Sequence, residues 1–148
     1  MRAITKIVVG TDFSEISERA LGLALDIAAR TSAAIELVHA YSVPSFSLPI
    51  EGAVMASASY VAEQSSKLQA QLDATVARHA QSGVRLSAHL RNGVPHEELC
   101  NFARQVGADL IVIGTHGRSG PAHVLLGSVA ERVLRIADCP VLTVPRGQ

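Results

Sequence analysis

The segment from Gly114 to Ser128 contains residue types that could bind phosphate. Its sequence is GTHGRSGPAHVLLGS, and it lies between an apolar, β-branched run and a helical pattern. Glycines let backbone N–H groups approach oxyanions and permit positive φ, and a helix N-terminus adds unsatisfied donors. Arg118 could supply a fork of N–H donors, and Ser128 a hydroxyl. The segment therefore indicates an anion-binding loop; the alternative is an ordinary strand-to-helix turn whose glycines only make it tight.

Two better-known phosphate loops are absent from the sequence. There is no GxxxxGK[ST] pattern, and the two lysines, Lys6 and Lys67, are far along the chain from the glycine-rich segment. The turn after the first apolar run, residues 10–15, reads GTDFSE and lacks GxGxxG. These observations argue against a P-loop NTPase and against a dinucleotide-dependent oxidoreductase.

Five apolar runs alternate with four helical patterns along the chain. The predicted strands are Ile4–Val9, Ala34–Tyr41, Val84–Arg91, Asp109–Gly114 and Pro140–Val144. The predicted helices follow Ser14, run from about Ser57 to Ser82, begin at Pro95 and end before Gly107, and begin at Ser128. This order predicts an α/β fold: one doubly wound, open, parallel five-stranded sheet with helices on both faces. Ligands of such sheets bind at the carboxyl ends of the strands, here between the first and fourth.

The start of the last predicted helix and the long stretch after the second predicted strand allow more specific predictions. Ser128 is followed three residues later by Glu131, a spacing that predicts a capping box in which Ser128 caps the last helix. Residues 42–56 form a long stretch with two prolines and a glycine. Long loops are uncommon without a role, so we interpret this stretch as either a lid over a site or a packing loop.

Composition narrows the class of protein. The chain has 148 residues, 48% of them apolar, which suits a single domain spanning residues 1–148. Thirteen basic residues balance thirteen acidic ones, so we expect no attraction to nucleic acid or to an anionic membrane. The N-terminus has no signal-peptide pattern, and no apolar run is long enough to span a bilayer. We therefore expect a cytoplasmic protein whose two cysteines are reduced.

The histidines do not indicate a metal site or a catalytic centre. His39 shares a strand face with apolar residues and is expected in the core or at its rim, whereas His79, His89 and His96 are expected at the surface. His116 lies within the glycine-rich segment, where a loop-stabilising role is favoured over contact with phosphate. No pair of histidines has metal-ligand spacing, and no nucleophile–base pair is visible. We predict no catalytic residue and no protein metal site.

A glycine motif and four further segments of the sequence resemble the universal stress protein family. The spacing Gly114-x-x-Gly117-(nine residues)-Gly127-Ser128 matches the nucleotide motif of that family, G-2x-G-9x-G-[S/T]. Residues 7–15, 92–95 and 127–134, and the end of the chain at 139–144, are also similar to it. The resemblance covers the whole chain except residues 42–56, and the segments occur in the family's order.

The resemblance implies the strand order 3-2-1-4-5 and membership of the ATP-binding subclass, with Mg²⁺ or Mn²⁺ carried by the phosphates. By this resemblance Asp12 would bond the ribose or lie near the adenosine, and Ala40 would contact the adenine through its backbone. The remaining positions would surround the ribose and the phosphates. The residues that it assigns to nucleotide binding are Thr11, Asp12, Ala40, Gly114, Gly117, Arg118, Gly127, Ser128 and Val129.

The resemblance further implies an ATP-dependent sensor or switch of the stress response, with at most slow ATP hydrolysis or autophosphorylation. It also implies a homodimer through residues 141–144, and this apolar strand at the end of the sheet favours the same pairing. Two alternatives stay open: a dimeric interaction module that does not depend on nucleotide, and an adenylyl-transferring or ATP-pyrophosphatase enzyme of related architecture. The enzyme would need catalytic segments beyond those visible in 148 residues.

Overall fold

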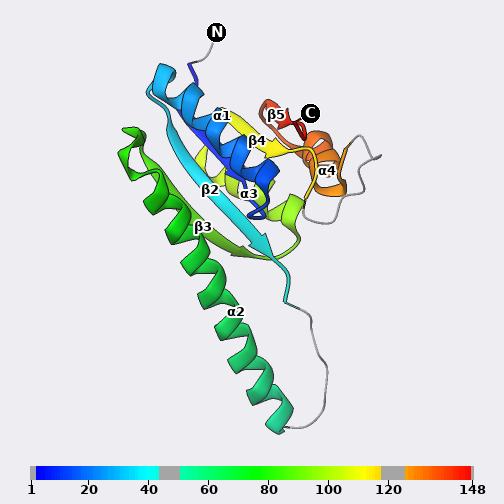
Figure 1. Cartoon of the computed structure of the whole chain (residues 1–148). Coiled ribbons are helices and arrows are strands. Elements are labelled where there is room, and N and C mark those ends of the chain that lie inside the picture. Colours follow the sequence, from blue (N-terminus) through cyan, green and yellow to red (C-terminus); the bar gives the residue numbers. More distant parts are fainter. Residues whose placement is uncertain (1–2, 44–50, 118–125, 148) are drawn as a thin grey trace.

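A computed structural model describes residues 3–43, 51–117 and 126–147, with side chains of residues 51–57 excepted. The strands are β1 (Lys6–Gly10), β2 (Ala34–Tyr41), β3 (Leu86–Asn92), β4 (Leu110–Gly114) and β5 (Val141–Val144). The helices are α1 (Glu15–Thr31), α2 (Glu51–Arg78), α3 (Pro95–Val106) and α4 (Ser128–Ile136), with a short 3-10 helix at Ala80–Ser82. The strands form one parallel sheet in the order β3-β2-β1-β4-β5 (Figure 1). The predicted fold class and strand order are confirmed, and strand bounds shift by two residues at most.

The sheet separates two apolar layers, and β1 contributes to both. Ile7 and Val9 belong to the cluster that also contains buried residues of α1 and Leu72 of α2. Val8 points the opposite way, into the cluster formed by α3 and α4. Ile7, Val8 and Val9 are all fully buried. The continuous apolar run predicted this, because successive residues of a strand face opposite sides.

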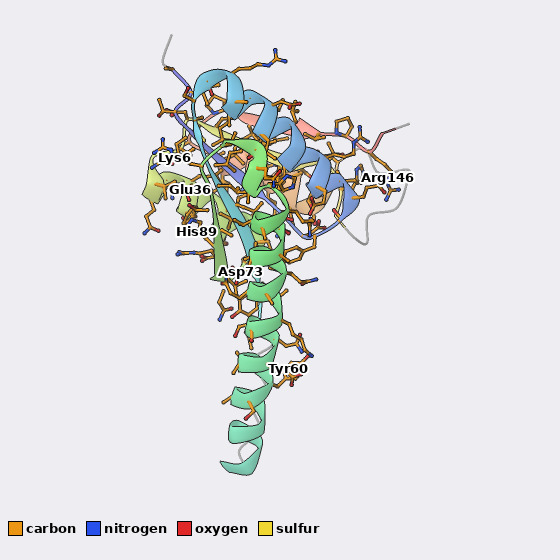
Figure 2. The ribbon with its side chains drawn as sticks, turned by 60° about the vertical axis from the view of Figure 1, so that its left-hand side comes forward. Lys6, Glu36, Tyr60, Asp73, His89 and Arg146 are labelled. Carbon is orange, nitrogen blue, oxygen red and sulfur yellow. The ribbon has the colours of Figure 1, made fainter. Side chains whose placement is uncertain are left out.

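The longest helix, α2, differs from the prediction at both ends. It begins six residues earlier than expected, at Glu51, and ends at Arg78 before the 3-10 turn and Gly83. Glu51, Ala53, Met55 and Ala56 are good helix formers, and the helix extends through Gly52 into the stretch expected to be irregular. Residues 44–50, the middle of the expected lid or packing loop, lie outside the described residues. With 28 residues, α2 is about 42 Å long. Its C-terminal half packs on the sheet, and its N-terminal half, with Tyr60, extends past it (Figures 1 and 2).

All three histidines expected at the surface, His79, His89 and His96, are partly buried. The Nε2 of His89 lies 2.6 Å from Oε2 of Glu36 on the neighbouring strand, and the two side chains meet on the sheet (Figure 2). The ring of His89 also stacks on Phe102, with 4.6 Å between centroids. The side chain of His96 is only 13% exposed. Sequence polarity did not reveal that α3 covers this part of the sheet.

The two cysteines are free thiols that pack with the α3 and α4 layer. Burial raises the pKa of Cys100 above the usual value for a thiol, and it raises the pKa of Cys139 in the same direction. Both side chains are therefore held in the neutral form near neutral pH. Among the described residues, no helix is long and apolar enough to cross a membrane.

Candidate nucleotide site at the carboxyl ends of the strands

A cavity of about 620 Å³ opens where β1, β2 and β4 end. Its volume is typical of small-molecule sites. Eight of the nine residues predicted to bind nucleotide line this cavity, and the ninth, Arg118, lies outside the described residues. The eight are Thr11, Asp12, Ala40, Gly114, Gly117, Gly127, Ser128 and Val129. The fold therefore brings together residues that are separated by more than 100 positions in the sequence.

The turn after β1 presents Asp12 to this cavity. The backbone N–H of Thr11 donates to the carbonyl of Val38 at 2.9 Å, which extends the β1–β2 pairing to the start of the turn. The N–H of Ser14 donates to Oδ1 of Asp12 at 3.0 Å. Phe13 adopts the left-handed conformation, with φ of 62°. Local side-chain bonds of this kind are typical of Asp in turns, and here they orient the carboxylate.

The loop after β4 approaches the same carboxylate from the other side. A Cβ on Gly117 would lie 2.8 Å from Oδ2 of Asp12, so a larger residue there would displace the carboxylate. A Cβ on Gly114 would lie 2.6 Å from Cγ2 of Ile16, and one on Gly127 would lie 2.9 Å from the carbonyl oxygen of Thr115. Each of these glycines lets a different part of the chain approach closely: α1 at Gly114, the turn after β1 at Gly117, and the start of the loop itself at Gly127.

The conformational reason that we expected for the glycines is wrong at these positions. Positive φ occurs at Gly83, Gly93 and Gly107, and none of the three described loop glycines has it. The missing side chain, and not the left-handed backbone, is therefore what the loop requires from Gly114, Gly117 and Gly127. Glycine serves both purposes, and a sequence pattern does not distinguish them.

The start of α4 differs from the predicted capping box. The N-cap residue is Gly127, with φ of −71° and ψ of 156°, and no side chain caps the helix. Ser128 is the first helical residue, one position too late for its hydroxyl to cap. The N–H of Glu131 instead donates to the carbonyl of Gly127 at 3.0 Å. Ser128 lines the cavity among the first-turn N–H groups that a helix leaves without intrahelical partners.

Sequence reasoning missed most of the apolar wall of the cavity. Leu68 of α2, Leu99 of α3 and Ile113 of β4 line it, although their periodicity indicated only core packing. Pro95, which the sequence marked only as the start of a helix, lines it too. His39, expected in the core or at its rim, is half-buried and lines the cavity too. No local motif marks these residues as a set, because they come from four different elements, α2, α3, β2 and β4.

The glycine-rich loop also orders its own histidine. Nδ1 of His116 lies 2.9 Å from Oγ1 of the buried Thr115, a contact consistent with the loop-stabilising role expected from the sequence. Among the described residues, no group of three or more His, Cys, Asp or Glu side chains could hold a metal ion.

The observed starts of α1 and α4 predict that replacing Ser14 and replacing Ser128 by alanine will change stability by different amounts. Ser14 is the N-cap of α1, and its hydroxyl accepts from the N–H of Ser17 at 3.3 Å. Ser14→Ala should lower the free energy of unfolding by about 1 kcal/mol. Ser128→Ala, which removes no cap, should change it by less than about 0.5 kcal/mol. Urea unfolding followed by circular dichroism measures both, and a larger loss for Ser128→Ala would contradict the assignment.

Comparisons with known proteins agree with this geometry. The sequence profile of the universal stress protein family matches residues 3–145. Universal stress protein MJ0531 of Methanocaldococcus jannaschii is 37% identical over 142 residues, which cover 95% of this chain and 82% of that protein. The solved structure of protein MJ0577 has a TM-score of 0.86 at 25% identity and covers 99% of both chains.

A third comparison concerns a structure with a bound nucleotide. A universal stress protein solved in complex with cAMP has a TM-score of 0.72 at 30% identity, and the alignment covers 97% of this chain and 98% of that one. The family profile, the MJ0531 relative and the sheet order all agree over nearly the whole length. The chain therefore belongs to the universal stress protein family.

Proposed function

We propose that the cavity binds ATP and that the protein acts as a nucleotide-dependent switch in the stress response. The observation that carries this proposal is the meeting of Asp12 with Gly117, where a carboxylate suited to ribose hydroxyls lies against a glycine loop suited to phosphates. The cAMP complex of a family member at 30% identity supports a nucleotide as the ligand class. ATP is the nucleotide that the G-2x-G-9x-G-[S/T] spacing favours.

The adenine is assigned to the apolar side of the cavity. Leu68, Leu99 and Ile113 provide apolar surface there, which suits a planar base that leaves water. Ala40 adds a backbone N–H and C=O, and the pairing of the strands determines where they point. The carbonyl of Val38 accepts from the N–H of Thr11, which follows β1, so the backbone groups of Val38 point toward β1. Residues two apart in a strand direct their backbone groups to the same side. Ala40 therefore directs its N–H and C=O past the end of β1, toward the cavity.

The phosphates are assigned to the opposite side, along the loop and the start of α4. The N-terminus of a helix carries partial positive charge and unsatisfied N–H donors, and Gly127, Ser128 and Val129 lie there against the cavity. The glycines leave space that a side chain would fill, so a phosphate chain fits this side. Arg118, outside the described residues, belongs to the same proposal, and a Mg²⁺ or Mn²⁺ ion would arrive with the phosphates.

A switch role requires binding without rapid turnover. The sequence offers no nucleophile–base pair, and slow ATP hydrolysis or autophosphorylation is the most that the proposal includes. The role also requires a compartment that contains ATP, so the cytoplasm is part of the proposal. A nucleotide-independent interaction module is the competing function, and it differs in one measurable respect, which is affinity for ATP.

Titration calorimetry of the purified protein with ATP and Mg²⁺ tests the proposed function. We expect a dissociation constant in the micromolar range, equivalent to about −8 kcal/mol, with GTP binding more weakly. Mass spectrometry of ligand released from the protein as purified gives an independent readout. Absence of binding up to millimolar ATP would favour the nucleotide-independent module.

Substitution of Gly117 tests the location of the site. In Gly117→Ala the new Cβ would lie 2.8 Å from Oδ2 of Asp12 and would displace the carboxylate. Loss of one charge-assisted hydrogen bond costs about 1.5–3 kcal/mol, so ATP affinity should fall by about tenfold or more. Gly22→Ala in α1 is the matched control, because its Cβ has no neighbour within 4 Å. Equal affinities of the two variants would locate the nucleotide elsewhere.

We further propose that two copies of the chain pair through β5. This strand ends the sheet and pairs with β4 on one side. The carbonyls of Pro140 and Val144 accept from the N–H groups of Ile111 and Thr115, both at 2.9 Å. Because backbone groups alternate along a strand, Val141 and Thr143 direct theirs outward, where edge groups favour another strand. A two-fold axis would pair both edges at once.

Thr143→Pro tests this pairing. Proline removes the outward N–H of Thr143 and is tolerated in edge strands, so the bonds from β5 to β4 should survive. Light scattering should give twice the chain mass of 15.6 kDa for the wild type and for the control Thr143→Val, and the single mass for Thr143→Pro. A wild-type monomer at micromolar concentration would refute the dimer and leave the ATP proposal untouched.

A further inference from the structure

We infer that His39 is a positioning residue that holds Asp12 for the ribose and so gives the site its preference for nucleotides with ribose hydroxyls. The inference rests on the proposed ATP function, because it assigns the ribose to Asp12. It concerns a residue that the sequence placed only in the core or at its rim. Its basis is the set of contacts that His39 makes with both neighbours of Asp12.

The turn that carries Asp12 includes an unfavourable backbone conformation. Phe13 has φ of 62°, a left-handed conformation that is rare for bulky residues. Its N–H donates to Oγ1 of Thr11 at 3.0 Å, and this bond spans Asp12. Such strain persists only where surrounding contacts hold the residue in place, so the turn needs support from outside itself.

His39 supplies that support at two points. Its Nδ1 lies 2.8 Å from the carbonyl oxygen of Thr11; since a carbonyl only accepts, Nδ1 carries the proton and donates. Its ring also stacks on the ring of Phe13, with centroids 4.6 Å apart and an interplanar angle of 40°. One imidazole therefore holds the residue before Asp12 and the residue after it.

The support comes from a well-anchored part of the sheet. His39 belongs to β2, which pairs with β1 on one side and β3 on the other, with His39 opposite Leu90. The backbone of His39 is therefore fixed by the sheet, and the imidazole transmits that position to the turn. Rigid elements position a site more accurately than loops do.

The contacts of His39 determine the orientation of the Asp12 carboxylate. Its Oδ1 accepts from the N–H of Ser14, and its Oδ2 lies on the side of Gly117 in the cavity. A change in the turn would rotate this carboxylate away from the position where ribose hydroxyls could donate to it. The adenine and phosphate sides, formed by other elements, would keep their contacts.

Affinities for ATP and for 2′,3′-dideoxy-ATP, measured by calorimetry, test the inference. The wild type should prefer ATP by about tenfold, as expected for hydrogen bonds to a carboxylate. His39→Phe keeps an aromatic ring but loses the donor, and it should lower ATP affinity by about tenfold while affinity for the dideoxy nucleotide stays within about twofold. His39→Asn keeps a donor but loses the ring, and its preference for ATP should fall by about threefold.

A double-mutant cycle with Asp12→Ala separates positioning from direct contact with the nucleotide. If His39 acts through Asp12, His39→Phe should have no further effect on ATP affinity in the Asp12→Ala background. Additive losses would assign His39 a direct contact and overturn the positioning role. Circular dichroism and urea unfolding identify variants that are not folded, and His39→Asn then replaces His39→Phe in the cycle.

His89→Phe is the matched control. His89 stacks on Phe102 with the same 4.6 Å between centroids, at an interplanar angle of 41°, and it does not line the cavity. This variant should keep the wild-type affinities for both nucleotides.

The outcomes separate the two proposals. A wild type that binds neither nucleotide overturns the ATP function and this inference together. A wild type that binds both equally overturns only the inference, as do His39 variants that keep the wild-type preference or lose affinity equally for both nucleotides.

Discussion

The parallel pairing of β1 with β4 is the contact on which the site depends. Ile7, Val8 and Val9 lie opposite Leu110, Ile111 and Val112, and both strands are buried on their two faces. The chain continues to β2 on one side of this pair and to β5 on the other, so the connections leave the two strands in opposite directions. Ligand sites of open α/β sheets form at such a reversal. Here it directs the turn after β1 and the loop after β4 to a single cavity.

The two segments that meet there contribute different chemistry. The turn after β1 supplies a carboxylate whose orientation depends on local hydrogen bonds. The loop after β4 supplies backbone without side chains, close enough that a Cβ at Gly117 would collide with that carboxylate. Neither segment forms a site alone. The glycine pattern is therefore best understood as a requirement for close approach between segments, and the absence of positive φ at the described loop glycines agrees with this.

Strain and support are divided between different elements of the fold. The left-handed Phe13 is in the turn, whereas the ring that packs against it belongs to β2. The apolar wall of the cavity is likewise shared, with Leu68 from α2 and Leu99 from α3. The C-terminal half of α2 packs on the sheet (Figure 1), and Leu72 there is fully buried. Leu68 precedes Leu72 by one helical turn and lines the cavity. The cavity thus joins the rigid sheet to the projecting helix.

The order of the elements, the parallel sheet and the glycine loop could all be predicted from the sequence, because hydrophobic period and turn residues are local properties. Eight of the nine predicted site residues line one cavity, since the carboxyl ends of neighbouring parallel strands share an edge. Local reasoning failed where a shift of one residue changes the role of a side chain. Ser128 is the first helical residue and not the cap. It also failed for His39 and Leu68, whose neighbours in the cavity come from other elements. Contacts such as that of His39 with Thr11, 28 residues away, leave no periodic signal, so they became visible only when the packed sheet brought these residues together.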